Sequence, residues 1–133
     1  MAVSSKRVTF AAPVDRVWNV ITSCGEYSWR SDLSRIEEFK EQKKFIEYTK
    51  DGYQTTFVIT AFEPCKRYEF DMENENMSGH WTGIFSVENG MTCLELTETV
   101  NAKKILMKPF VRMYLKKQQE IYLRDLKKAL GEA

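Results

Sequence analysis

The sequence predicts an α+β protein in which a curved, seven-stranded antiparallel sheet wraps around one long C-terminal helix. Three observations predict it. Residues 34–100 fall into short runs in which apolar and polar side chains alternate, the period of half-buried strands. Asp51-Gly52 and Asn89-Gly90, both strong hairpin signals, separate some of these runs. Residues 103–130 contain no glycine and are rich in Lys, Leu, Gln and Glu, as a long helix requires.

The first elements precede the run of strands. Residues 3–11 are a predicted strand, and residues 13–22 a short amphipathic helix. Pro13 suits the first turn of that helix, where no backbone N–H is needed, and Cys24-Gly25 ends it. Residues 26–33 are expected to form a second short helix or a tight loop, so one or two short helices follow the first strand.

The remaining strands and the long helix complete the sheet and cover it. Because tight turns join the strands, the pattern predicts an antiparallel meander with one face covered by helices and one face exposed to solvent. The long helix is expected to start or kink near residues 107–109, where Pro109 lies, and to end at Gly131. The six further strands are predicted at 35–41, 44–50, 53–62, 65–73, 77–88 and 91–100.

Bulk properties restrict the function. A length of 133 residues fits a single domain, 1–133, and a net charge of +1 gives no electrostatic case for binding nucleic acid. No apolar run approaches the roughly 18–20 residues of a membrane span, and Met1–Phe10 lacks the apolar stretch of a signal peptide. We therefore expect a cytoplasmic protein without integral membrane association. Three scattered cysteines and one histidine predict neither a disulfide framework nor a metal site, and no cofactor is expected.

Short motifs at the joints between these elements resemble one superfamily along essentially the whole chain. They are FAAPVDRVWNVI (10–21), YSWRSDLSRIEE (27–38), KRYEF (66–70), GHWTGIFSVENGMTCLELTETV (79–100) and YLRDLKKALGE (122–132). The pattern resembles the START/birch-pollen-allergen-like (SRPBCC) superfamily, with its helix-grip fold, and within it the bacterial polyketide cyclase/dehydrase-like branch. The resemblance implies a cavity between sheet and helix that holds lipids, sterols, polyketides or other apolar molecules. Only some members of the superfamily are enzymes.

Glu98 is the candidate for a catalytic residue. It alternates with the apolar Leu96 and Val100, so its side chain is expected to face the interior. A buried carboxylate is costly unless it is paired or protonated. Glu98 is therefore either a polar anchor or acid/base in the cavity, or a residue near the strand end that reaches water or a basic partner.

His80, the only histidine, is expected outside. Its neighbour Trp81 lies on the apolar face, so His80 points towards solvent unless a bulge at Gly79 or Gly83 reverses it.

The helix and the aromatic residues supply the other candidates. Gln118 and Gln119 lie inside or beside the apolar arc of the helix, where they either orient a ligand or flank the arc in water. Asp125 is expected at the surface.

The basic stretch 103–117 is either a solvated helix face or a contact for an anionic membrane surface or partner. The aromatic residues either line a pocket or form plain core. The predicted ligand-binding residues are Tyr53, Phe57, Tyr68, Phe70, Trp81, Phe85, Leu96, Glu98, Tyr114, Gln118 and Tyr122.

No phosphate-binding loop, nucleophile elbow or metal signature is present in the sequence, which favours binding over catalysis. We expect a module that binds a small hydrophobic or amphipathic ligand of lipid-, sterol- or polyketide-like type. One alternative is a cyclase- or dehydratase-type enzyme that uses cavity acids and amides. Another is an interaction or co-chaperone-like domain whose cavity is filled. A homodimer is left open.

Overall fold

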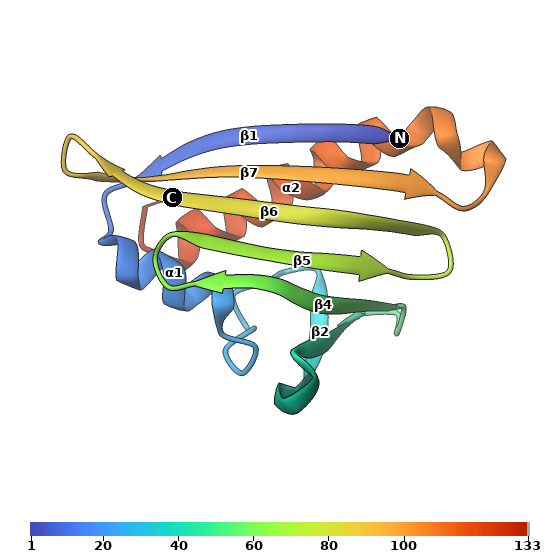
Figure 1. Ribbon diagram of the computed structural model, residues 1–133, viewed down its shortest axis with the longest axis horizontal. Helices are drawn as coiled ribbons and strands as arrows, with labels where there is room; N and C mark the ends of the chain where they lie inside the picture. Colours follow the sequence, from blue (N-terminus) through green and yellow to red (C-terminus); the bar gives the residue numbers. More distant parts are fainter. Residues whose placement is uncertain (133) are drawn as a thin grey trace.

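The predicted α+β architecture is confirmed by a computed structural model, which describes residues 1–132. Seven strands form one antiparallel sheet in the order β1-β7-β6-β5-β4-β3-β2 (Figure 1). The strands are β1 (Ala2–Phe10), β2 (Leu33–Phe39), β3 (Lys44–Thr49), β4 (Gln54–Glu63), β5 (Arg67–Glu73), β6 (Met77–Glu88) and β7 (Met91–Ala102). The helices are α1 (Val14–Thr22) and α2 (Val111–Ala129), with two 3₁₀ helices, η1 (Lys40–Gln42) and η2 (Ile105–Phe110).

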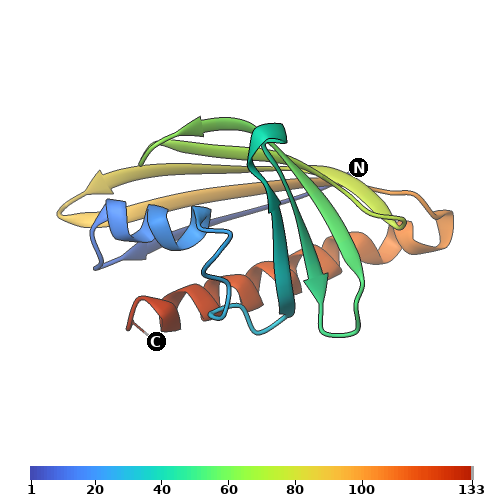
Figure 2. The same cartoon turned by 90° about the horizontal axis from the view of Figure 1, so that it is seen from below.

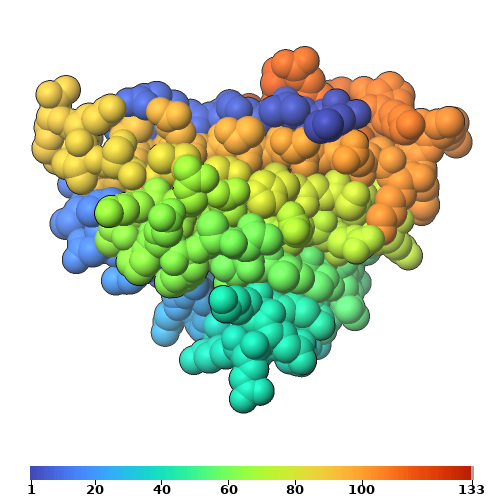
Figure 3. Space-filling view, in the orientation of Figure 1, coloured from blue at the N-terminus to red at the C-terminus, as the bar shows by residue number. Residues whose placement is uncertain are grey.

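The sheet curves over α2, and α1 covers one end of the same concave face (Figure 2). The opposite, convex face carries no helix and forms the surface seen in Figure 3. This arrangement follows from the alternation in the strands, because each strand has one apolar face and the helices are the only elements that can cover it. Phe10, Val17, Leu94 and Leu126 lie at the centre of the core and are fully buried.

The first strand completes the sheet beside the last one. β1 pairs with β7 over nine residue pairs, from Ala2 opposite Val100 to Phe10 opposite Thr92. β1 and β2 are therefore the two edges of the sheet, although only α1 and the two connections that flank it separate them in the sequence.

Three connections between elements bear on the predictions. Where a short helix or a tight loop is expected at residues 26–33, residues 26–32 form a loop, with a turn in which Arg30 N–H donates to Tyr27 O at 3.0 Å, and β2 begins at Leu33. The turn at Asp51-Gly52 spans three residues, not two, because Thr49 N–H already bonds to Tyr53 O at 2.9 Å. The expected break near 107–109 is confirmed, since η2 contains Pro109 and α2 begins at Val111.

Gly79 allows β6 to lie close to its neighbouring strand β7. A Cβ at this position would lie 2.4 Å from Thr99 O and 2.9 Å from a methyl group of Val100. We expect Gly79→Ala to lower the free energy of unfolding by about 1–3 kcal/mol, because β6 or β7 must shift. Gly25→Ala is the matched control: a Cβ there meets nothing within 4 Å. Urea denaturation of both variants checks this, and equal stabilities would contradict it.

Candidate functional site

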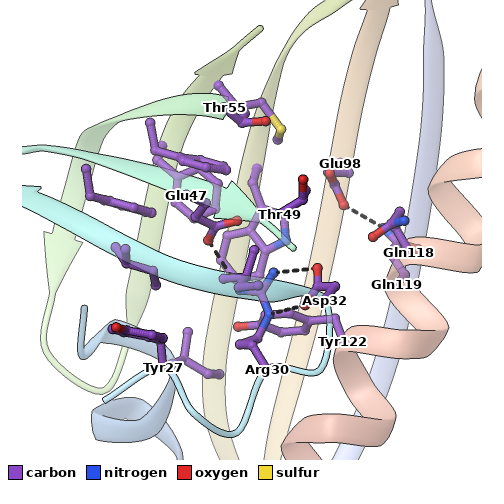
Figure 4. A pocket seen from close by; sticks show the side chains of 18 of the residues that line it. Tyr27, Arg30, Asp32, Glu47, Thr49, Thr55, Glu98, Gln118, Gln119 and Tyr122 are labelled. Carbon is purple, nitrogen blue, oxygen red and sulfur yellow. Dashed lines mark hydrogen bonds and ion pairs between the residues drawn. The ribbon is translucent and has the colours of Figure 1, made fainter. Parts of the chain in front are cut away.

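A cavity of about 230 Å³ lies between the concave face of the sheet and α2 (Figure 4). Its wall includes ten of the eleven predicted ligand-binding residues; that they bind a ligand stays a prediction. The ten are Tyr53, Phe57, Tyr68, Phe70, Trp81, Leu96, Glu98, Tyr114, Gln118 and Tyr122.

Phe85 is the exception. It is buried, but its ring centroid lies 4.9 Å from that of Trp18 on α1, outside the cavity wall. The expectation that it lines the cavity is therefore wrong. β6 continues beyond the cavity to the end of the sheet that α1 covers, and period-two alternation cannot distinguish cavity wall from core along one strand.

Stacked rings form the apolar part of the cavity wall. Phe45 and Phe57, on the neighbouring strands β3 and β4, stack with centroids 4.7 Å apart. Phe70 and Trp81, on β5 and β6, stack at 5.0 Å and are nearly parallel. Cross-strand aromatic pairs of this kind hold their rings in fixed orientations, so the sheet presents a rigid apolar surface to the cavity.

Glu98 points into the cavity from β7, as the alternation predicted. It lies opposite Ser4 on β1 and Trp81 on β6. The Gln119 amide of α2 donates a long hydrogen bond of 3.5 Å to its carboxylate, so the contact is weak (Figure 4). One carboxylate oxygen therefore remains available to a molecule in the cavity.

The two glutamines of α2 differ in role. Gln119 is 2% exposed, and its amide bonds to the Ser4 hydroxyl at 2.8 Å and to the Ser4 carbonyl at 3.1 Å. Gln119 therefore joins the helix to β1 and is largely satisfied by the protein. Gln118 lines the cavity and is the amide that a ligand can reach.

Burial raises the pKa of Glu98 to about 7, partly offset by the Gln119 hydrogen bond. A carboxyl group whose folded pKa exceeds its unfolded value of about 4.3 stabilises the fold only while protonated. We therefore expect stability to fall as pH rises from about 4.5 to about 7. Glu98→Gln should remove this part of the pH dependence. NMR titration of the Glu98 carboxyl carbon checks the pKa directly, and a midpoint near 4 would contradict this prediction.

A partly buried ionic cluster of Arg30, Asp32 and Glu47 forms the opposite wall of the cavity. Arg30, in the loop before β2, donates two hydrogen bonds of 3.1 Å to Asp32 and one of 3.2 Å to Glu47 on β3 (Figure 4). Its guanidinium also lies 5.0 Å from the Tyr122 ring and 5.7 Å from the Trp29 ring. The Arg30 side chain is only 12% exposed, so these contacts hold it in one position.

The pKa values of Arg30 and Glu47 are both raised, for different reasons. Burial would lower the pKa of Arg30, but Glu47 and Asp32 outweigh this and raise it. Burial raises the pKa of Glu47, and the nearby Arg30 charge only partly offsets this. Arg30 is therefore always charged, and two carboxylates already neutralise it.

The ionic cluster is not among the sites predicted from the sequence. The inward orientation of Glu47 could have been predicted from the sequence, because Glu47 lies two residues from the apolar Phe45 on the same strand face. Glu98 has the same relation to Leu96. The positions of Arg30 and Asp32 could not be predicted in this way, because they lie in an irregular loop without a repeating apolar pattern.

The remaining polar groups of the cavity are neutral hydrogen-bonding groups. Burial raises the pKa of the Tyr68 and Tyr122 hydroxyls, and it raises the pKa of the Cys24 thiol to about 12. Cys24 is therefore not a thiolate nucleophile at neutral pH. The Tyr53 hydroxyl accepts a hydrogen bond of 2.8 Å from the Asn76 side chain.

The sequence also predicts the positions of two residues outside the cavity wall, Asp125 and His80, both at the surface. Asp125 is 4% exposed, so its expected surface position is wrong: its carboxylate accepts hydrogen bonds of 2.8 Å from both the backbone N–H and the hydroxyl of Ser31. It ties the loop that carries Arg30 to α2. His80 lies on the convex face, as expected, between Asp71 at 2.7 Å and Glu69 at 2.8 Å.

Among residues 1–132, no group of three or more His, Cys, Asp or Glu side chains could hold a metal ion. No helix formed by these residues is long and apolar enough to cross a bilayer.

The sheet, the long helix and the cavity between them define a helix-grip protein of the START-like type. Residues 1–131 match the family described as "Polyketide cyclase / dehydrase and lipid transport", and the chain belongs to that family. A search of curated proteins found no match.

Solved structures share the fold at low sequence identity. A conserved protein from Geobacillus kaustophilus is 12% identical, with a TM-score of 0.82 over 98% of this chain and 95% of that one. A START superfamily protein from Mycobacterium smegmatis is 13% identical, with a TM-score of 0.79 over 98% and 97%. DynU16, from the dynemicin biosynthetic locus, is 15% identical, with a TM-score of 0.80 over 98% of this chain and 48% of that one.

Proposed function

We propose that this protein binds a compact, neutral, amphipathic molecule in the cavity between the sheet and α2. The observation that supports this is a cavity of about 230 Å³ that combines stacked aromatic rings with a few polar groups. Apolar walls with few, well-placed polar groups are typical of small-molecule sites. The volume lies below the ~300–1,000 Å³ of most such sites, which favours a compact ligand. The family's description, with its lipids and polyketides, agrees with an apolar ligand body.

The charges in the cavity favour a neutral ligand. Arg30 is the cation of the cavity wall, and three of its five N–H donors are already bonded to Asp32 and Glu47. An anionic ligand would have to compete with both carboxylates and would meet Glu98 as well. A ligand carbonyl or hydroxyl can instead accept from protonated Glu98 or from the Tyr122 hydroxyl.

Binding of 2-naphthol, a fused-ring molecule with one hydroxyl group, tests the proposal. We expect saturable binding by calorimetry and chemical-shift changes at residues of the cavity wall. Native mass spectrometry of the purified protein should reveal a co-purifying small molecule. Gln118→Trp places a large ring in the cavity and should weaken naphthol binding more than tenfold.

Glu120→Trp is the matched control, because Glu120 is exposed on the same helix and does not line the cavity. It should bind 2-naphthol like the unmodified protein. If the unmodified protein neither binds naphthol nor carries a co-purifying molecule, or if both variants bind equally well, the proposal fails.

A second function is favoured by Glu98. A cavity carboxyl with a pKa near 7 can both donate and accept a proton at neutral pH, as cyclase- or dehydratase-type chemistry requires. This enzyme would abstract a proton next to a carbonyl group. In D₂O the protein should then accelerate deuterium exchange at the α-carbon of 2-tetralone, and Glu98→Gln should abolish the acceleration while retaining binding. If the unmodified protein leaves deuterium exchange at the rate seen in buffer alone, the enzymatic function is contradicted.

The interaction or co-chaperone-like alternative needs a filled interior, which a cavity of this volume does not favour. The cytoplasmic location and the homodimer stay predictions, and analytical ultracentrifugation would measure the oligomeric state.

A further inference from the structure

Five large apolar side chains are exposed on one short segment of the chain. They lie on η2 and the first turn of α2, and they make up five of the eleven exposed large hydrophobic residues of the described chain. Their exposed fractions run from 48% for Tyr114 to 84% for Leu106. The five are Ile105, Leu106, Phe110, Met113 and Tyr114. Such a group of apolar side chains indicates a contact surface more often than a solvated one.

The geometry of α2 keeps Phe110 and Met113 out of the core, whereas Tyr114 also reaches the cavity wall. Val111 and Leu115 occupy the inner face of the helix and pack with Val100 in the core. Phe110, Met113 and Tyr114 follow the spacing i, i+3, i+4, so they share another face of the helix. Figures 1 and 2 place η2 at one end of the molecule, projecting beyond the sheet.

Positive charge surrounds the exposed apolar residues. No acidic residue occurs between Glu98 and Glu120. Lys103 pairs with Glu73 at 2.7 Å, and in residues 1–132 the other basic side chains of the segment form no ion pair. The neighbouring β5–β6 turn contributes one further acidic residue, Glu75. The basic residues are Lys103, Lys104, Lys108, Arg112, Lys116 and Lys117.

We propose that residues 103–117, the docking segment, bind the surface of an anionic lipid bilayer. Ile105, Leu106 and Phe110 enter the boundary between headgroups and acyl chains, while the lysines and Arg112 contact anionic headgroups. Apolar and basic groups combined in this way are characteristic of interfacial segments. Each Lys or Arg near such a surface strengthens binding about five-fold.

Charge complementarity favours a bilayer over a second copy of this chain. A symmetric dimer through the docking segment would bring two sets of basic side chains together without matching acidic groups. The docking segment also reaches the cavity, because Tyr114 is 48% exposed and lines the cavity wall. Docking would therefore set the cavity rim against the lipid surface; this last step, unlike docking itself, rests on the proposed ligand binding.

Vesicle flotation tests the proposal. We expect the protein to float with vesicles of 70% phosphatidylcholine and 30% phosphatidylglycerol, but not with phosphatidylcholine alone. Raising the salt from 0.05 to about 0.5 M should weaken binding at least tenfold, because the Debye length shortens from roughly 14 Å to about 4 Å. Binding to both vesicles alike, or to neither, would overturn the proposal. No cavity ligand is needed for this readout.

Two pairs of variants separate the apolar and basic contributions. L106E/F110E and K104S/K108S should each reduce binding at least tenfold, with circular dichroism confirming that they fold. The matched controls are V87E, an apolar residue 60% exposed at the distant β6–β7 turn, and K40S/K43S, exposed lysines at η1. Equal losses in variants and controls would overturn the proposal. So would a dimer that L106E/F110E dissociates and that fails to float, because the partner would then be a second copy.

Discussion

Replacing Arg30 with methionine is expected to lower the free energy of unfolding by about 3 kcal/mol. The change removes the cation but leaves Glu47 and Asp32 in the cavity wall, with side chains 16% and 27% exposed. Breaking a buried ion pair by removing one partner costs about 3–5 kcal/mol, and partial access to water places this case at the lower end. The loss should shrink as pH falls, because protonation removes the unpaired charge of Glu47, whose pKa is already raised by burial.

Arg7→Met is the matched control. Arg7 also pairs with two carboxylates, those of Glu88 and Glu95, but its side chain is 49% exposed. Exposed pairs contribute about 0–1 kcal/mol, so Arg7→Met should change stability little. R30M/E47L should recover part of the loss, since it removes the unpaired carboxylate together with the cation. Urea denaturation at pH 7 measures all three. Equal losses for Arg30→Met and Arg7→Met would show that burial does not govern these pairs.

Replacing Leu126 with alanine should cost about 3 kcal/mol of stability. Leu126 is fully buried where α2 meets the main core, among Phe10, Trp18 and Leu94. Leu→Ala changes at such positions cost about 2–5 kcal/mol through lost burial and the cavity that remains. Leu106→Ala, at an 84% exposed position, should cost less than about 0.5 kcal/mol. Comparable midpoints for the two variants in denaturant would refute the placement of α2 against the sheet.

The sheet could be predicted because its information is local. Alternation within each strand placed Glu98 and Tyr68 on the inner face, and turn residues separated the strands. The break at Pro109 and the end of α2 shortly before Gly131, whose φ is 74°, likewise follow from single residues with restricted or unusual backbone conformations.

The polar half of the site depends on contacts between segments far apart in the sequence. Asp125 is predicted at the surface from its place near the end of the helix, but it is buried. Its burial is stabilised by Ser31, 94 residues earlier in a loop without periodicity. Arg30 likewise meets Glu47 only after the loop is placed against β3. No pattern in either segment specifies its partner, so such pairs emerge only from the assembled fold.

The pairing of β1 with β7 has a consequence for how the chain folds. β3 to β7 are joined by short turns and can pair as soon as each strand exists, whereas Ala2 and Val100 must meet across roughly 98 residues. Closing a loop of that length costs about 3 kcal/mol more conformational entropy than closing a short turn. β1 is thus expected to join last, after the meander has formed a template for it. Until then β7 is an unpaired edge, and Gln119 on α2 has no Ser4 to bond. The slowest step of folding should therefore be the one that closes the sheet against its helix.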